Sequence, residues 1–164
     1  MKKVLFIAIA CLGFAFSSQA QVGFKAGGHI GLPVSDAEDV SSFLAGVDLA
    51  YLVEAGTNFY VGGATGYTNF FGEDVGAFEY EDFGIVPIAA SGLYTQGDGS
   101  FLAGVDLGYA FFTNIDGSDG GFYYNPKVGY DFGAPEVTFS YKGVSEGDAT
   151  IAGITAGFAY KFSY

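Results

Sequence analysis

The chain has 164 residues, 50% of them hydrophobic and 18% aromatic, with 27 glycines, 4 prolines and no tryptophan. Because glycine is unfavourable in helices and aromatic residues favour strands, this composition predicts an all-β protein. Six lysines, no arginine and 18 acidic residues give a formal net charge of −12. This balance excludes nucleic-acid binding, which needs a basic face to neutralise phosphates.

The first 20 residues have the pattern of a secretory signal peptide. Lys2 and Lys3 supply the charged start, an apolar run follows, and residues 18–20 place small side chains where signal peptidase needs them. The apolar run is shorter than the roughly 20 residues that a transmembrane helix requires. We therefore expect residues 1–20 to be a cleavable signal peptide, with cleavage before Gln21.

Cys11 raises the alternative of a lipoprotein, although the residues before it lack the usual leucine. Cleavage after residue 20 removes this one cysteine, which excludes disulfides and cysteine-based metal sites from the mature chain. Residues 21–164 then keep four lysines and all 18 acids, a net charge of −14, and have the length of one domain.

Eight segments of residues 21–164 alternate apolar side chains with polar or small ones. A period of two is typical of strands with one apolar face. The expected strands are 22–32, 43–53, 59–70, 83–94, 101–113, 122–130, 136–144 and 151–164. Most have about the length of a tilted strand that crosses a bilayer. Longer acidic loops follow the odd-numbered strands and short glycine-containing turns follow the even-numbered ones, an asymmetry typical of outer-membrane barrels.

The apolar face of nearly every expected strand is rich in aromatic residues, whereas all four remaining lysines lie on the other face. An uncompensated charge facing lipid costs about 2–4 kcal/mol, so we expect the aromatic face to meet lipid and the lysine face to line a lumen. The residues expected inside with charge or an imidazole are Lys25, His29, Asp48, Asp106, Lys127, Lys142 and Lys161. Buried charges need partners, so we expect the lysines to form a network with the two aspartates.

Two prolines qualify the strand pattern. Pro33 is expected to end the first strand, and Pro87 to cause a bulge within the fourth. The fourth strand is apolar on both faces. The side chains that we expect to face outward are Val86, Ile88, Ala90 and Tyr94.

The last ten residues, 155–164, alternate strictly and end on an aromatic residue. In a closed barrel this strand pairs with the first one and leaves no exposed edge. A soluble β-sandwich, with the aromatic residues buried between two sheets, is the alternative that alternation leaves open. The polar, glycine and aromatic positions Thr155, Gly157, Tyr160 and Phe162 resemble the C-terminal signal by which bacterial outer-membrane barrels are recognised for assembly.

Several short stretches together resemble the small OmpA/OmpX-type outer-membrane barrels, in particular the outer-membrane β-barrel domain family often labelled "porin family". The stretches are residues 22–27, 43–47, 85–88 and 157–162, and the resemblance covers the whole of residues 21–164. It implies an eight-stranded antiparallel up-and-down transmembrane barrel in the outer membrane of a Gram-negative bacterium, a monomer surrounded by outer-membrane lipid and inserted by the barrel-assembly machinery. It implies no agreed activity and no catalytic residues.

We therefore expect a non-catalytic outer-membrane barrel with acidic extracellular loops that acts in envelope structure or binds a surface ligand of unknown identity. No catalytic, cofactor-binding or metal-binding residue is assigned. A lipid-modifying enzyme is one alternative, for which His29 is the only candidate base. A narrow channel is another, although eight strands leave an interior filled by side chains. Asp116 and Asp119 offer oxygen ligands without the spacing of a calcium loop.

Overall fold

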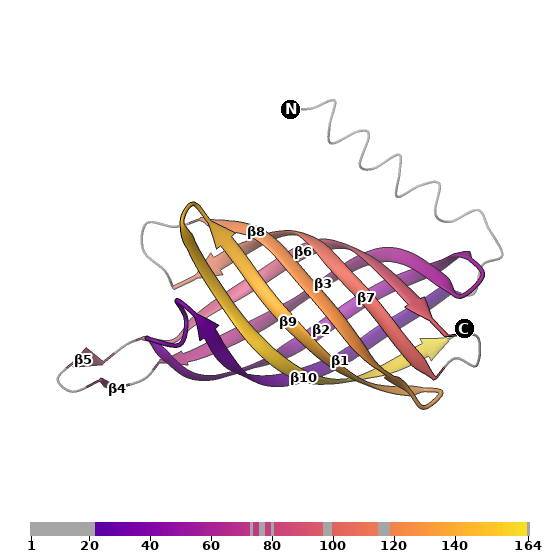
Figure 1. Ribbon diagram of the computed structural model, residues 1–164, viewed down its shortest axis with the longest axis horizontal. Coiled ribbons are helices and arrows are strands. Elements are labelled where there is room, and N and C mark those ends of the chain that lie inside the picture. Colours follow the sequence, from indigo (N-terminus) through magenta and orange to yellow (C-terminus); the bar gives the residue numbers. More distant parts are fainter. Residues whose placement is uncertain are drawn as a thin grey trace, which may run out of the picture.

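The protein forms a closed antiparallel barrel in a computed structural model that describes residues 22–72, 74–75, 78–79, 81–96, 100–114 and 119–163 (Figure 1). The predicted signal peptide, Gln21 and Tyr164 lie outside the described residues. The eight barrel strands are β1 (Val22–Ser35), β2 (Ser41–Gly56), β3 (Phe59–Gly72), β6 (Phe83–Thr95), β7 (Phe101–Thr113), β8 (Gly120–Asp131), β9 (Pro135–Glu146) and β10 (Ala149–Ser163). A small hairpin of β4 (Asp74–Val75) and β5 (Phe78–Glu79), which was not expected, lies within the connection between β3 and β6.

Each barrel strand pairs with its neighbours in the chain, and β1 closes the barrel against β10. The closing seam runs from Gly23 opposite Ser163 to Ser35 opposite Ile151 without a shift in register. The predicted eight-stranded up-and-down barrel is confirmed, and the soluble sandwich is wrong. Closure removes the exposed edges that an apolar last strand would otherwise present.

The strands are longer than expected, and Pro33 does not end the first one. Pairing of β1 with β2 stops at Gly31, but pairing with β10 continues through Pro33 to Ser35. Proline is tolerated where one edge of a strand has no partner, because its missing N–H then breaks no ladder on that side. Hydrophobic alternation could not reveal this difference between the two edges.

The bulge expected at Pro87 is also wrong. Pro87 stays in register opposite Ala110 of β7, and β6 keeps one register with β3 on both sides of the proline. On the β3 side no pairs form next to it, and the Thr65 hydroxyl donates a hydrogen bond to the Pro87 carbonyl instead, at 2.7 Å. The β6 facing is as expected, with Ile88, Ala90 and Tyr94 exposed.

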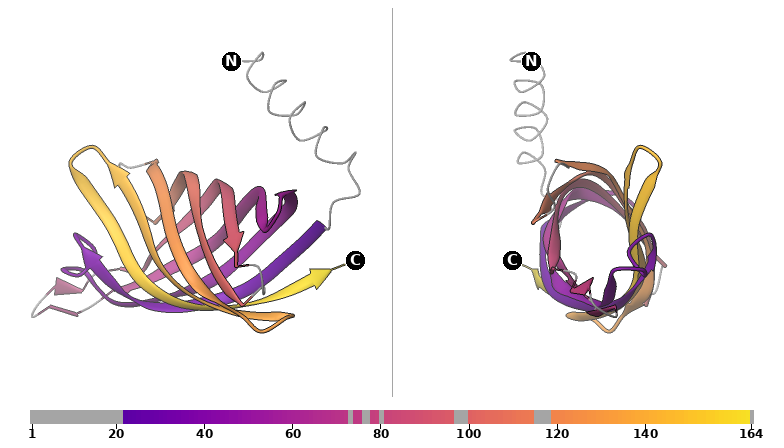
Figure 2. Two further views of the ribbon diagram at one scale, coloured as in Figure 1. Left: turned by 45° about the vertical axis from the view of Figure 1, so that its right-hand side comes forward. Right: turned by 90° about the vertical axis from the view of Figure 1, so that its left-hand side faces the viewer.

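The two ends of the barrel differ (Figures 1 and 2). The start of β1 and the end of β10 lie at one end, here called the terminal end. The opposite end, here called the loop end, carries the connections 36–40, 73–82 and 114–119 and the β9–β10 turn. That last turn contains only residues 147–148, because β9 and β10 extend further than the sequence predicted. Among the described residues, no helix is long and apolar enough to cross a membrane.

Candidate functional site

The outer surface of the barrel is apolar along the middle of its strands. Large aliphatic side chains that would be buried in a soluble protein are exposed here, for example Ile30 at 68% and Ile88 at 63%. The exposed aliphatic residues are Ile30, Leu32, Val47, Leu49, Ile88, Val105, Leu107, Val128 and Ile154. We call this surface the aliphatic belt. Its size, on nearly every strand, far exceeds the scattered apolar residues of a water-exposed surface.

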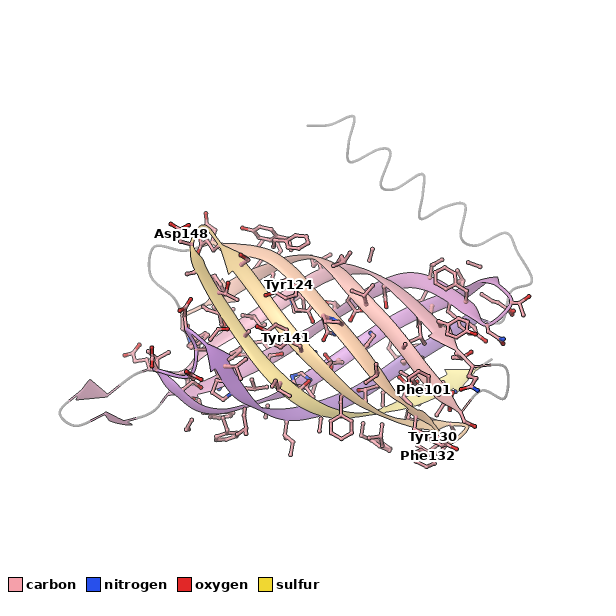
Figure 3. All side chains as sticks on the ribbon, viewed as in Figure 1. Phe101, Tyr124, Tyr130, Phe132, Tyr141 and Asp148 are labelled. Atoms are coloured by element: carbon pink, nitrogen blue, oxygen red, sulfur yellow. The ribbon has the colours of Figure 1, made fainter. Side chains whose placement is uncertain are left out.

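Aromatic side chains border the belt toward both ends of the barrel. The loop-end girdle consists of Phe43, Tyr67, Phe71, Tyr109, Phe111, Phe122, Tyr124 and Tyr141, and the terminal girdle of Phe24, Tyr51, Phe59, Tyr94, Phe101, Tyr130, Phe132, Tyr160 and Phe162. Figure 3 shows Phe101, Tyr130 and Phe132 together near the terminal end. Many of these rings contact one another, such as Phe43 and Phe71, whose centroids are 4.2 Å apart. Two aromatic girdles around an apolar band are the surface of a transmembrane barrel.

The lumen contains all four lysines of the described residues, each paired with one carboxylate. Nearest the terminal end, Lys25 Nζ lies 2.6 Å from Glu136 Oε2, and Lys161 pairs with Asp131. Each carboxylate offsets part of the repulsion between Lys25 and Lys161, which lie directly opposite each other on β1 and β10.

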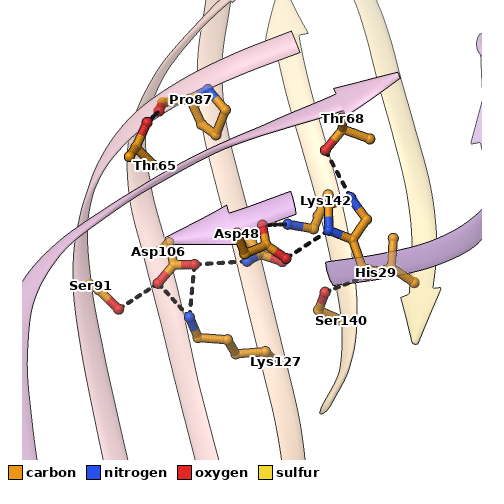
Figure 4. Close-up of polar contacts among 12 residues, drawn as sticks. His29, Asp48, Thr65, Thr68, Pro87, Ser91, Asp106, Lys127, Ser140 and Lys142 are labelled. Atoms are coloured by element: carbon orange, nitrogen blue, oxygen red, sulfur yellow. Dashed lines mark hydrogen bonds and ion pairs between the residues drawn. The ribbon is translucent and has the colours of Figure 1, made fainter. Parts of the chain in front are cut away.

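The middle of the lumen holds the second group of polar contacts (Figure 4). Lys127 Nζ donates to both oxygens of Asp106, at 2.7 and 2.9 Å. The Ser91 hydroxyl and the Asn125 amide donate to the same carboxylate, at 2.6 and 2.8 Å. Asp106 therefore accepts four hydrogen bonds, which offset the cost of burying its side chain.

Asp48 forms the third group. Lys142 Nζ donates to Asp48 Oδ1 at 2.7 Å, and His29 Nδ1 lies 2.7 Å from Asp48 Oδ2. The other ring nitrogen of His29, Nε2, lies 3.0 Å from the Thr68 hydroxyl. Glycine at position 46 makes room for this imidazole, because a Cβ there would approach both His29 Cε1 and Nε2 to 2.8 Å.

The predicted lumen network is thus confirmed for its residues and partly for its pairing. The two aspartates do bind lysines, but only two of the four: Asp48 pairs with Lys142, and Asp106 pairs with Lys127. Sequence reasoning missed Glu136 and Asp131 because each lies at the end of a strand and was read as turn or strand boundary. Their inward position follows from the same alternation that places lysines in the lumen, so the signal was present.

The loop-end half of the lumen is apolar, which the sequence analysis did not anticipate. A cluster here called the loop-end plug fills it, consisting of Ala37, Leu44, Phe70, Phe83, Ile85, Ala89, Ala110, Tyr123 and Val144. The rings of Phe70 and Phe83 stack with centroids 4.8 Å apart. Ala37, which is 1% exposed, comes from the β1–β2 connection, so that this connection folds over the plug. The connection is fastened to β10 by Asp36, which accepts a hydrogen bond from the Thr150 amide at 2.7 Å.

A cavity of about 70 Å³ lies among the charged groups of the lumen. Lys25, Asp48, Asp106 and Lys127 contribute to its walls. Polar groups around a space of this size are typically bridged by water. In the part of the chain that the structure describes, the loop-end plug separates this polar space from the loop end.

The structure describes only one of the two acidic positions considered for metal binding. Across the described ranges, no group of three or more histidine, cysteine, aspartate or glutamate side chains is placed to hold a metal ion. Asp119 is described, whereas Asp116 falls outside the described residues.

The barrel resembles solved structures of small outer-membrane proteins. Ail, the attachment invasion locus protein of Yersinia pestis, is 16% identical in its crystal structure, with a TM-score of 0.60 over 88% of this chain and 100% of Ail. Ail in a phospholipid bilayer nanodisc is 15% identical, with a TM-score of 0.59 over the same shares of the two chains. A crystal structure of Ail with the heparin analogue sucrose octasulfate gives 17% identity and a TM-score of 0.56, again over 88% and 100%.

A designed transmembrane β-barrel is also similar, at 10% identity and a TM-score of 0.55 over 88% of this chain and 98% of the design. No family model and no curated protein matches the sequence. At these identities the likeness establishes the fold, that of small eight-stranded outer-membrane barrels. The narrower OmpA/OmpX-type assignment stays a prediction, and the designed barrel illustrates that one architecture forms without any particular biological function.

Proposed function

We propose that this protein is an integral outer-membrane barrel of a Gram-negative bacterium with its terminal end in the periplasm and its loop end outside the cell. It is a monomer without enzymatic activity, and it acts in envelope structure or surface interaction through its acidic loop end. The observation that carries the proposal is the aliphatic belt between two aromatic girdles, with every lumen lysine paired inside. Water would leave this belt unburied, whereas a bilayer covers it.

The packing of side chains in the lumen favours a barrel without an open pore over a channel. The loop-end plug fills the cross-section near the loop end with side chains such as Leu44 and Ile85, which are no more than 1% exposed. The polar cavity behind it has only about 70 Å³. An eight-stranded barrel has an interior that side chains can fill completely.

The Thr68–His29–Asp48 contacts resemble a hydroxyl–imidazole–carboxylate arrangement in which a histidine activates a nucleophile. Their surroundings favour a structural role. Thr68 is 2% exposed and His29 is 4% exposed, and His29 lines the small polar cavity inside the lumen. Asp48 also binds Lys142, which makes the group one part of the charge-pairing network. A lipid or peptide substrate that approached from the loop end would have to displace the loop-end plug to reach it.

The loop end determines what the protein can bind outside the cell. Three acids lie in the β1–β2 connection, five between β3 and β6, two between β7 and β8 and two at the β9–β10 tip, which makes twelve of the 18, and no lysine or arginine accompanies them. Ail was crystallised with a heparin analogue, but a sulfated anion would be repelled by this end of the barrel. The charge favours cationic partners and hydrated, extended loops.

Two measurements test the proposal. The protein, folded into phospholipid vesicles, should migrate differently on gels when unboiled and should resist protease, because every barrel strand is paired and covered by lipid. For orientation, Asp148→Cys at the loop end and Asn58→Cys at the terminal end provide single thiols. A membrane-impermeant maleimide should label only Asp148→Cys on intact cells and both variants after lysis. Labelling of Asn58→Cys on intact cells would show that the orientation is the opposite of the proposed one. Recovery of the protein in the soluble periplasmic fraction would contradict the proposed membrane location itself.

A further inference from the structure

A shallow apolar groove crosses the outer surface of β7, β8, β9 and β10. It has a volume of about 500 Å³ and is open toward the membrane-facing side. Ala103 on β7 and Pro126 on β8 form its floor. Its walls are Val128, Phe139, Tyr141 and Ile154.

The groove exists because short side chains meet tall ones on the membrane-facing surface. Ala103 is directly opposite Val128 in the β7–β8 pairing, and Val128 is opposite Phe139 in the β8–β9 pairing. Pro126 keeps its place opposite Val105 on β7, but no pair forms between it and β9. A proline has no N–H for that ladder, so this part of the wall presents a flat ring where other strands carry a long side chain.

Its position indicates the chemistry of the occupant. Val128, Phe139 and Ile154 are 49%, 60% and 55% exposed and belong to the surface that we place in the hydrocarbon of the bilayer. Tyr141 connects the groove to the loop-end girdle, since its ring stacks on Tyr124 with centroids 5.9 Å apart. Tyrosines of such girdles lie at the level of the lipid headgroups, where the ring is in an apolar environment and the hydroxyl is in a polar one.

We propose that this groove binds one acyl chain of a lipid from the leaflet at the loop end, more tightly than the lipid around the rest of the barrel. The chain lies on Ala103 and Pro126 between the side walls, and its headgroup lies near Tyr124 and Tyr141. A straight hydrocarbon chain fills an open apolar groove without leaving polar groups unpaired, whereas an irregular protein segment in the same place would leave its backbone groups unpaired. This inference rests on the proposed membrane location.

The test uses the absence of tryptophan from the chain. Tyr141→Trp places a single fluorophore in the groove, and Tyr67→Trp places one on β3, which lies on the opposite side of the barrel from β9. Both variants are folded into phosphatidylcholine vesicles with brominated acyl chains, which quench a nearby tryptophan, and are then transferred into detergent without brominated lipid. In vesicles both tryptophans should be quenched. After transfer, Tyr141→Trp should keep more than half of its quenching and Tyr67→Trp should lose nearly all of it.

Two controls complete the experiment. Ala103→Leu raises the floor, and combined with Tyr141→Trp it should remove the retained quenching, whereas Ala45→Leu on the outer surface of β2 should not. The unsubstituted protein, extracted from the same vesicles and measured by native mass spectrometry, should carry one lipid per barrel. Equal loss of quenching from both tryptophans, or a barrel mass without lipid, would overturn the groove proposal. A mass of two chains would assign the groove to a second copy instead. No quenching of either tryptophan in vesicles would overturn the membrane proposal together with it.

Discussion

Replacing Lys127 by methionine tests whether the lumen pairs hold the barrel together. Among the described residues, Lys127 is the only cation that contacts Asp106, and the two side chains are 17% and 5% exposed. The substitution keeps an apolar stem of similar length but removes both contacts to the carboxylate, of 2.7 and 2.9 Å. Asp106 keeps hydrogen bonds from Ser91 and Asn125, so its oxygens are not left bare, but its charge loses its counterion.

The size of the effect follows from this burial. Breaking one partner of a buried ion pair typically costs about 3–5 kcal/mol, while an exposed pair contributes about 0–1 kcal/mol. We expect Lys127→Met to lower the free energy of unfolding by about 3 kcal/mol, at the lower end of the buried range, because Asp106 retains two neutral donors. Lys161→Met should cost less, since the Lys161 side chain is 25% exposed and water screens the loss.

Urea titration of the vesicle-folded protein, followed by the mobility of the folded form on unboiled gels, measures both changes. The midpoint should fall for Lys127→Met with an unchanged dependence on urea, so that the difference reports stability alone. Adding Asp106→Asn should recover part of the loss, because the remaining group is neutral and still accepts hydrogen bonds. A neutral or stabilising Lys127→Met would mean that the lumen is well hydrated, and the account of paired charges in a poorly hydrated interior would be wrong.

Three further substitutions or truncations test other parts of the barrel. In the same titration, Ile88→Lys in the aliphatic belt should lower the free energy of unfolding by about 2–4 kcal/mol. Glu38→Lys at the loop end should change it by no more than about 0.5 kcal/mol. Equal effects of the two substitutions would mean that the belt is in water. Phe70→Ala in the loop-end plug should lower the free energy of unfolding by about 3–5 kcal/mol, because it leaves a cavity. Planar-bilayer recordings of the unsubstituted protein should show no steady conductance. Open-channel currents would contradict a closed lumen. Deletion of residues 162–164 should leave protein in the periplasm or degraded, because it removes the aromatic end of the strand that closes the barrel; a normal yield in the outer membrane would refute a role in insertion.

Alternation along single strands predicted most of the barrel wall. The inward facing of Lys25, Asp48 and Lys142 follows from their place between apolar neighbours, because adjacent side chains of a strand point to opposite faces. Strand ends were harder, because they depend on which neighbouring strand continues to offer hydrogen bonds. Pro33 illustrates this, since its strand has lost β2 as a partner but keeps β10.

The interior of the lumen was predictable only in part. That Lys127 points inward is a local property of β8, but its pairing with Asp106 depends on the register between β8 and the neighbouring β7. The loop-end plug depends on register as well, because Leu44, Phe70 and Phe83 lie directly opposite one another on β2, β3 and β6. Closure of the barrel then adds Val144 of β9 to the same cluster. Alternation places Leu44 and Phe70 on the inward faces of β2 and β3, but it does not show that these side chains gather into one plug.

The distribution of charge links the interior to the surface. Each lumen lysine is neutralised by one acid, so the interior of the barrel carries no net charge. Residues 21–164 contain no other lysine or arginine, and the whole excess of fourteen acids therefore lies at the two ends, twelve of them at the loop end. Carboxylates crowded in this way repel one another unless counterions come from the surroundings. In the proposed orientation these counterions are cations of the external medium. Their concentration should therefore change the mutual repulsion of the loops, while the paired lumen remains unaffected because salt screens buried pairs much less than exposed charges.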